Sequence, residues 1–283
     1  MQSVVTVLAV TALAAVCVLI VFLGMLWQYQ ERLVFQPPAP PYPDGGSTRR
    51  IDFRGPDGQL LFAYLVNHPS KRGVVIAFHG NADLAAWQIP WATELGRRSG
   101  YAVLLPEYRG YAGLSGSPAY STARSDAHAA YSLAQDSLEY PPDRIALFGH
   151  SLGSAIAAEL ATDVRPTTLV LQSPLASARE MARQIATPAT VLFWAGLARV
   201  HYDTEKLVRT LDVPVWVVHG ARDAVVPVRM GERVFSAAAR KGKFLLVDDA
   251  GHNDLESRGG EQYWSWLLNA LTSRQQEAVS GSE

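Results

Sequence analysis

Residues 144–161 read RIALFGHSLGSAIAAELA, and they decide the fold because a serine stands between two glycines where two sequence patterns meet. Residues 145–148 are a short apolar run, which is typical of a buried strand. The alanine-rich residues from Ser154 onward favour a helix. The pentapeptide at residues 149–153 therefore lies at a strand-to-helix turn, which is where a G-x-S-x-G sequence exposes a reactive serine.

The spacing of Gly149, Ser151 and Gly153 has a physical reason. A tight turn forces the serine into a strained backbone conformation and leaves no room for side chains two residues to either side. The start of the following helix offers free N–H groups and its positive dipole end to a developing oxyanion. The alternative is that Ser151 only caps the helix, as serines often do. A nucleophile needs a base and an acid, so these partners decide between the two interpretations.

The rest of the chain alternates between strand and helix patterns. Strands are predicted at residues 51–54, 60–66, 73–78, 101–106, 144–148, 167–172, 213–218 and 243–247. Helices are predicted at residues 84–99, 121–138, 152–163, 229–240 and 261–271, and residues 175–210 are partly helical. This alternation indicates an α/β fold with a mostly parallel central sheet and helices on both faces. The first two strands are expected to form an antiparallel hairpin, and the site is expected beyond the carboxyl ends of the parallel strands.

One transmembrane helix is predicted before this domain, because residues 4–27 carry no charge. At ~1.5 Å of rise for each residue, this segment is long enough to cross a ~30 Å hydrocarbon layer. Trp27 and Tyr29 stand where interfacial aromatic residues belong. A cleaved signal peptide is the competing interpretation, but no basic residue precedes the segment and its apolar core is long. An uncleaved single-pass membrane anchor is therefore favoured.

The chain divides into four parts on this basis. Residues 1–30 are the expected membrane anchor, and residues 31–50 a proline- and glycine-rich tether or surface loop. Residues 51–273 form the expected catalytic domain, with a small helical cap or insert at residues 175–205. Residues 274–283 are expected to be a disordered tail.

Composition limits the possible functions further. The net charge of −1 argues against a nucleic-acid surface, and the single cysteine, Cys17, excludes a disulfide framework and a cysteine metal site. No metal or organic cofactor is expected. The arginines that follow the apolar segment, at positions 32, 49 and 50, favour the cytoplasmic side for the catalytic domain.

His252 is the candidate base for Ser151. It stands in DDAGHNDL at residues 248–255, directly after the last predicted strand, so its loop reaches the expected catalytic edge of the sheet. His252 is also the last histidine, and hydrolases with this serine turn carry the serine, the acid and the histidine in that chain order. The alternative is an exposed loop histidine without a catalytic role.

Asp223 is the candidate acid, because it lies between the serine and the histidine and follows the strand at residues 213–218. The alternative is an ordinary carboxylate of a surface turn. Asp248, Asp249 and Asp254 are rivals, but they lie so close to the histidine in the sequence that they are expected to shape its loop.

Two backbone N–H groups are expected to form the oxyanion hole. Leu152 follows the nucleophile directly, and Asn81 follows His79-Gly80 at the end of another predicted strand. The Asn81 side chain has an alternative role as a cap of the following helix, and Asp83 could cap it too.

The chain resembles the membrane-anchored branch of the α/β-hydrolase-domain serine hydrolases. The resemblance is carried by FHGNA at 78–82, EYRGYAGLSGSP at 107–118, GHSLG at 149–153, YDTEKLVRTLDVPVWVVHGARDAVVPV at 202–228 and GHNDL at 251–255. These motifs span most of residues 50–272. The resemblance implies an α/β-hydrolase fold and a substrate like those of esterases, acyl-protein thioesterases, lysophospholipases or monoacylglycerol lipases.

The sequence departs from that family at Glu107, Ala112 and Leu114, where similar proteins mostly have aspartate, glycine and a small polar residue. These changes affect the loop beside the site, and so bear on substrate preference more than on chemistry. Tyr108 and Arg109 are expected to brace this loop, with contact between Arg109 and an anionic head group as the alternative.

The expected function is a two-step acyl transfer on an ester or thioester of a small molecule, a lipid or an acylated protein, through Ser151, His252 and Asp223. Phe193, Trp194 and Leu197 would line an acyl groove if residues 175–205 form a cap; the alternative is a pair of helices packed on the sheet. The competing functions are a serine peptidase on the same fold and a non-catalytic membrane-tethered scaffold. A dehalogenase would need aspartate at position 151.

Overall fold

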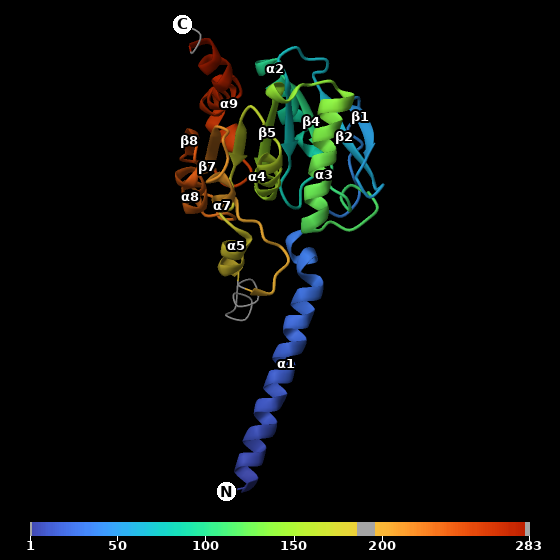
Figure 1. The fold of residues 1–283 in the computed structure, drawn as a ribbon, viewed down its shortest axis with the longest axis vertical. Coiled ribbons are helices and arrows are strands. Elements are labelled where there is room, and N and C mark those ends of the chain that lie inside the picture. The colour runs from blue at the N-terminus through green and yellow to red at the C-terminus, as the bar shows by residue number, and fades with distance from the viewer. Residues whose placement is uncertain (1, 186–195, 281–283) are drawn as a thin grey trace.

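A single mixed sheet organises the domain (Figure 1). The computed structural model describes residues 2–185 and 196–280. Eight strands lie in the order β1-β2-β4-β3-β5-β6-β7-β8. Their bounds are β1 Arg49–Arg54, β2 Leu60–Val66, β3 Val74–Phe78, β4 Ala102–Pro106, β5 Ile145–His150, β6 Leu169–Gln172, β7 Val215–Gly220 and β8 Lys241–Val247.

The strand directions agree with the sequence pattern. β1 pairs antiparallel with β2, and β2 pairs antiparallel with β4. From β4 to β8 all pairs are parallel, so the carboxyl ends of β3, β5, β6, β7 and β8 meet at one edge of the sheet. The predicted hairpin and the predicted parallel sheet are both confirmed.

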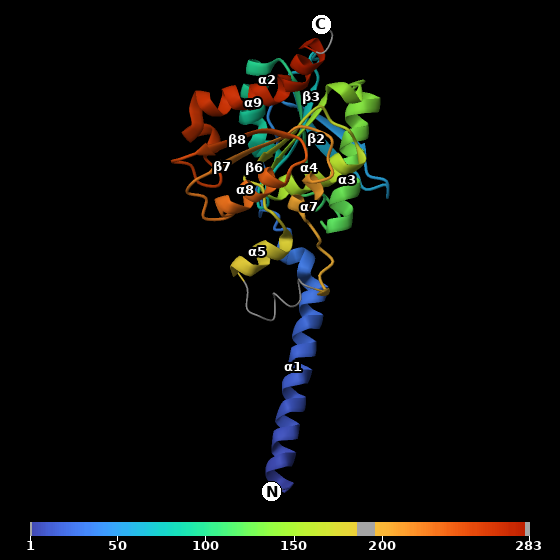
Figure 2. The same ribbon diagram turned by 60° about the vertical axis from the view of Figure 1, so that its left-hand side comes forward.

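Helices cover both faces of the sheet (Figure 2). The bounds are α1 Gln2–Val34, α2 Ile89–Ser99, α3 Tyr120–Ser132, α4 Leu152–Asp163, α5 Ala178–Ile185, α7 Thr204–Val208, α8 Val228–Ala237 and α9 Leu255–Ser280, with short segments η1 Ala85–Gln88, η2 Leu133–Ser137 and η3 Pro142–Arg144. Side chains that alternate along each strand feed two separate cores, as Val75 and Ile76 of β3 do. One core packs α2 and α9 on the sheet, and the other packs α3, α4, α7 and α8.

Two helices extend past the boundaries expected at the ends of the domain. The helix α9 continues to Ser280, where a disordered tail was expected from residue 274; residues 281–283 lie outside the described residues. The helix α1 continues to Val34, beyond the expected end of the anchor at residue 30. Phe35 is 2% exposed and Tyr42 packs against the core, so this part of the expected tether lies on the domain surface.

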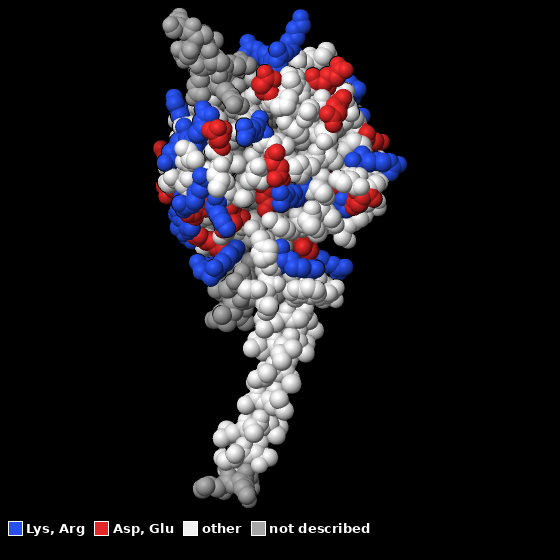
Figure 3. Space-filling model, in the orientation of Figure 1, with Lys and Arg blue, Asp and Glu red and all other residues white. Residues whose placement is uncertain are grey.

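The helix α1 projects from one end of the domain, and α5 lies at that same end in both views (Figures 1 and 2). By length and composition, α1 could cross a membrane, a property that membrane anchors and signal sequences share. The surface of its exposed length carries no charged side chain until the junction with the domain (Figure 3).

Candidate active site

The turn between β5 and α4 has the geometry that the two glycines predict. Ser151 has φ 52° and ψ −116°, a left-handed conformation that residues with a side chain rarely adopt. A Cβ atom on Gly149 would lie 2.3 Å from the carbonyl oxygen of Gly153. A Cβ atom on Gly153 would lie 2.1 Å from the carbonyl oxygen of Phe78 in β3. Close backbone packing therefore requires both glycines, and the turn presents Ser151 at the carboxyl edge of a central strand.

Asp223 and His252 lie on the loops after β7 and β8, and the structure brings them together. The His252 Nδ1 atom is 2.7 Å from Asp223 Oδ2. Asp223 Oδ1 accepts hydrogen bonds from the N–H groups of Val225 and Val226 at 2.9 and 2.8 Å. The carboxylate is thus fixed by its own loop while it faces the imidazole, which is the arrangement that orients a catalytic histidine.

His219 is a site residue that sequence reasoning did not assign. It is fully buried at the end of β7, with Nε2 at 2.9 Å from Val226 O and 3.2 Å from Asp223 Oδ2. Burial alone would raise the pKa of Asp223, but hydrogen bonds from His219 and His252 outweigh burial and hold that pKa well below its usual range. These hydrogen bonds therefore favour the ionised form of the carboxylate. The sequence signal was a histidine four residues before the acid.

His150 connects the serine turn to the histidine loop. The His150 ring lies 5.0 Å from the His252 ring, centroid to centroid, and its Nε2 is 3.1 Å from His252 O. The backbone of the base is thus fixed against the residue next to Ser151. In the described part of the chain Ser151 Oγ makes no hydrogen bond, so the hydroxyl is free to rotate toward a base or a substrate.

The buried His150 predicts a specific acid sensitivity. Burial, with the nearby His252, lowers the pKa of His150 from 6.5 to about 3. Below about pH 6.5 the His150 imidazole is therefore protonated in the unfolded chain but not in the folded protein. The free energy of unfolding consequently falls as pH falls. Between about pH 6.5 and pH 5 the loss should be about 2 kcal/mol.

Urea unfolding of the wild type and His150→Gln at these two pH values measures this loss. The wild type should lose about 2 kcal/mol more unfolding free energy than the variant, since glutamine does not titrate. Equal losses in both proteins would mean that His150 accepts a proton in the folded state.

The Asn81 side chain does not cap the following helix, so that alternative is wrong. Its Nδ2 donates to Val34 O at 2.7 Å, and its Oδ1 accepts from Gln36 N–H at 2.9 Å and from the Tyr111 hydroxyl at 2.8 Å. Asp83 Oδ1 accepts the N–H of its neighbour Leu84 at 2.7 Å.

The backbone at Asn81 and Leu152 is available to a ligand. Neither N–H donates a hydrogen bond within the described residues, and both residues line the same cavity as Ser151. Two free donors beside a serine hydroxyl are the components of an oxyanion hole.

A buried pair under the Asn81 loop accounts for one departure from the family. His79 Nε2 lies 2.9 Å from Glu107 Oε1, and both side chains are buried. Burial alone would lower the pKa of His79, but the facing Glu107 carboxylate outweighs burial and raises that pKa. Glu107 Oε2 also accepts the Ala85 N–H at 3.0 Å. The glutamate therefore ties β4 to the loop that carries Asn81.

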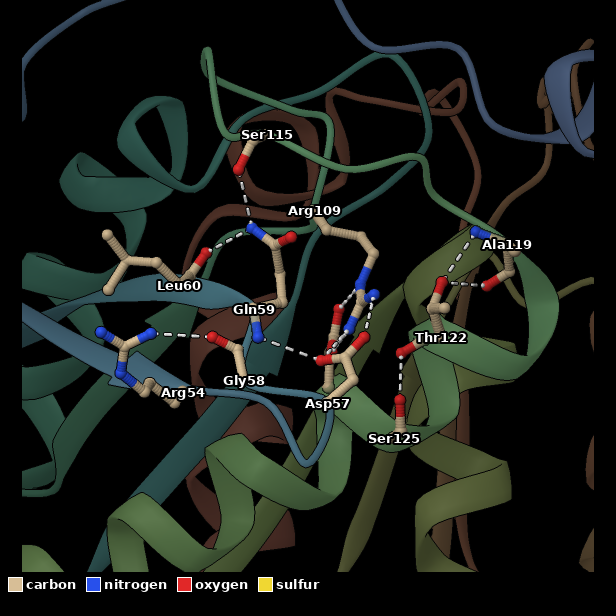
Figure 4. Close-up of polar contacts among 11 residues, drawn as sticks. Arg54, Asp57, Gly58, Gln59, Leu60, Arg109, Ser115, Ala119, Thr122 and Ser125 are labelled. Carbon is tan, nitrogen blue, oxygen red and sulfur yellow. Dashed lines mark hydrogen bonds and ion pairs between the residues drawn. The ribbon is translucent and has the colours of Figure 1, made fainter.

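Arg109 braces its loop and is not available to a head group. Its Nε and Nη2 donate to Asp126 at 2.7 and 2.6 Å, and its Nη1 donates to Asp57 Oδ2 at 2.7 Å. Figure 4 shows the guanidinium facing Asp57. Because two carboxylates occupy a buried guanidinium, the loop-bracing interpretation is the correct one.

Two of the three rival acids, Asp249 and Asp254, have other partners. Asp249 forms an ion pair with Arg222 at 2.5 Å, and its side chain is 67% exposed. Asp254 Oδ1 accepts the Gly251 N–H at 2.6 Å, which shapes the loop before His252. The structure therefore pairs His252 with Asp223, and Asp254 has the loop-shaping role that the sequence predicted.

A cavity of about 430 Å³ opens in front of Ser151. Its walls are mainly apolar. Besides the Ser151 turn and the Asn81 loop, they include Gln36, Leu175 and Tyr202 together with residues of α1, α5 and the Asp223 loop. Helix α1 gives Leu26, Leu33 and Val34, and α5 gives Ala178, Met181 and Ala182. Val225 and Val226 come from the loop that carries Asp223. This size falls in the range of small-molecule sites.

Of the predicted acyl-groove residues, the structure describes Leu197 alone. Phe193 and Trp194 lie outside the described residues. Leu197 is 53% exposed and does not line the cavity. The apolar residues that do face Ser151 come largely from α1 and α5, and of these only α5 belongs to the expected cap region.

The chain is similar to α/β-hydrolase-domain proteins. Residues 69–193 match the family model described as serine aminopeptidase, S33. The chain is 34% identical to the uncharacterized protein Rv2307c of Mycobacterium tuberculosis, over 94% of each chain. It is 29% identical to the alpha/beta hydrolase domain-containing protein 17C of Mus musculus, over 71% of this chain and 60% of that protein.

Solved structures show the same fold. The Pyrococcus furiosus esterase Pf2001 superposes with a TM-score of 0.67 at 19% identity, over 85% of this chain and 99% of the esterase. The structure of DcsB in complex with its substrate analogue superposes with a TM-score of 0.65 at 16% identity, over 81% and 100%. At these identities the likeness concerns the fold alone.

Proposed function

The chain belongs to the α/β-hydrolase family, and from this premise we propose that it is a serine hydrolase that cleaves ester or thioester bonds of acylated substrates. One observation carries the proposal. Ser151 stands at φ 52° on the wall of a mainly apolar cavity. The hydrogen-bonded pair Asp223–His252 lies on the loops after β7 and β8, at the same edge of the sheet as the Ser151 turn after β5. His150, the residue before Ser151, lies against the His252 ring with 5.0 Å between the ring centroids. A strained serine whose turn contacts a base–acid pair in this way supports the role of a nucleophile.

The reaction proceeds in two steps. His252 accepts the Ser151 proton while Oγ attacks the carbonyl carbon, and Asp223 stabilises the imidazolium that forms. The N–H groups of Asn81 and Leu152 hold the oxyanion. The tetrahedral intermediate collapses, and the alcohol or thiol leaves with the proton from His252. Water, deprotonated by His252, then attacks the acyl-enzyme and releases the carboxylic acid with Ser151 restored.

The cavity walls favour an acyl group over a peptide. The description of the matching family model makes an aminopeptidase the second candidate. An aminopeptidase must hold the α-ammonium group of its substrate, for which a carboxylate is the natural partner. Among the described residues that line the cavity there is no aspartate or glutamate. Leucine, valine, methionine and alanine side chains suit an acyl chain instead.

The helix α1 would act as an uncleaved single-pass membrane anchor. It runs without interruption from Gln2 to Val34, and Gln30 in its last turns is completely buried against the domain. Since the end of the helix is part of the folded domain, retention of the helix is favoured over removal as a signal sequence. The arginines at positions 32, 49 and 50 favour a cytoplasmic catalytic domain.

A substrate panel tests this function on the full-length protein in detergent micelles. The panel contains p-nitrophenyl esters, acyl thioesters and aminoacyl p-nitroanilides. We expect kcat/KM for the best ester or thioester to exceed that for every anilide by about 100-fold or more, because the described lining residues of the cavity include no carboxylate to pair with an ammonium group. Preferred turnover of an aminoacyl anilide would make the chain an aminopeptidase. Turnover of none of the three classes would favour a scaffold.

A further inference from the structure

The last turns of α1 pack against the domain and form hydrogen bonds with it. Gln30 is 0% exposed, and its Oε1 accepts the Val200 N–H at 3.3 Å and also the Arg199 N–H. The Arg199 guanidinium lies 4.4 Å from the Trp27 ring centroid and donates to Trp27 O at 3.1 Å. Glu31 Oε2 accepts the Tyr120 N–H at 3.1 Å. These contacts fix the direction in which α1 leaves the domain.

The same end of α1 is joined to the oxyanion loop. The Asn81 side chain bonds Val34 O and Gln36 N–H, as described above. The helix therefore holds a fixed position relative to the Asn81 backbone and to Ser151, which share one cavity.

One face of α1 looks into that cavity. Leu26, Gln30 and Leu33 are spaced by four and three residues, so they lie along a single helix face. Leu26 and Leu33 line the cavity, and the buried Gln30 between them anchors the face to the domain. Met25 lies on a different face, is 58% exposed and does not line the cavity.

We propose that α1 forms one wall of the acyl-chain site, so that the acyl chain of a membrane-borne ester or thioester lies between the Leu26–Leu33 face and α5 with its carbonyl at Ser151. This inference rests on the function proposed above. The wall is continuous with the apolar part of α1, which carries no charged residue between Gln2 and Gln30. An acyl chain can therefore pass from the bilayer to Ser151 along one apolar surface, without crossing water.

The size of the effect follows from the contact between chain and wall. Each buried methylene contributes about fourfold to binding. A tryptophan at position 33 would fill the space of several methylenes, whereas an alanine would enlarge the cavity. The two substitutions should therefore shift acyl-length preference in opposite directions.

The test compares Leu33→Trp, Leu33→Ala and the matched control Met25→Trp in full-length protein in the same micelles. The readout is the ratio of kcat/KM for p-nitrophenyl laurate to that for p-nitrophenyl acetate. We expect this ratio to fall about tenfold or more in Leu33→Trp, and to stay within about twofold of wild type in Met25→Trp. In Leu33→Ala the preferred chain should become longer.

Two outcomes would overturn the inference, and they are distinguishable. If all three variants keep the wild-type ratio while hydrolysis depends on Ser151, the proposed function stands and α1 is not part of the acyl site. If the wild type hydrolyses neither ester in a Ser151-dependent way, the proposed function fails and the acyl site fails with it.

Discussion

Ser151→Ala is expected to lower kcat for a p-nitrophenyl ester by about 10⁴- to 10⁶-fold. Alanine removes the hydroxyl that attacks the carbonyl carbon, so no acyl-enzyme can form. The proposed oxyanion donors and the cavity should remain, because the backbone of Asn81 and Leu152 and the apolar side chains of the cavity are unchanged. The residual rate is therefore expected to stay above that of the reaction in water.

The matched control for this prediction is Ser132→Ala. Ser132 is exposed at the end of α3, outside the cavity. Its kcat should stay within about twofold of wild type, as surface substitutions usually do. If Ser151→Ala kept more than about a tenth of wild-type kcat, Ser151 would not be the nucleophile.

Asp223→Asn is expected to lower kcat by about 10⁴-fold with little change in KM. An asparagine would present its NH₂ group to His252 Nδ1, at the place where the carboxylate oxygen now lies 2.7 Å away. The imidazole would then keep its proton on Nε2 and could not accept one from Ser151. Because the substitution keeps shape and volume, the substrate cavity should be unaffected.

Asp249→Asn provides the control, because Asp249 is one of the rival acids. Among the described residues it pairs only with the exposed Arg222. Its kcat should stay within about threefold of wild type. A large loss of kcat in Asp249→Asn together with a small loss in Asp223→Asn would mean that Asp249, and not Asp223, is the catalytic acid.

Local sequence patterns were enough to predict the turn at Ser151 and its neighbours. Glycine is needed at positions 149 and 153, because a Cβ atom at either position would collide with backbone atoms. The rule that parallel strands end at one edge was enough to predict that Asp223 and His252 would meet, although 29 residues separate them. These inferences needed only strand ends and residue types.

Contacts made far along the sequence could not be predicted. Gln30 bonds Arg199, which is 169 residues away, and nothing in an apolar segment reveals which of its faces a domain will cover. The sequence therefore suggested a tether from residue 31, whereas Phe35 is 2% exposed. The acyl groove was expected at Phe193, Trp194 and Leu197, of which only Leu197 belongs to the described residues. Leu197 does not line the cavity, whereas α1 does, and no pattern in the sequence pointed to α1.

His219 illustrates a third limit. A histidine beside a strand-end glycine has several roles open to it, and only the fold brings its Nε2 to within 3.2 Å of Asp223. On its other side the ring packs closely on α8, where a Cβ atom on Gly231 would lie 2.3 Å from His219 Nδ1. Close packing of a helix on a ring leaves no periodic signal in the sequence.

Fluorophosphonate labelling of the full-length protein in micelles tests the central claim most directly, with the labelled peptide identified by mass spectrometry. The reagent phosphonylates serines that a neighbouring base activates, and so reports on Ser151 and His252 together. We predict one labelled peptide, which carries Ser151 and disappears in Ser151→Ala. Folded wild-type protein that takes up no label, or takes it up at another serine, would contradict the assignment of Ser151 as the nucleophile.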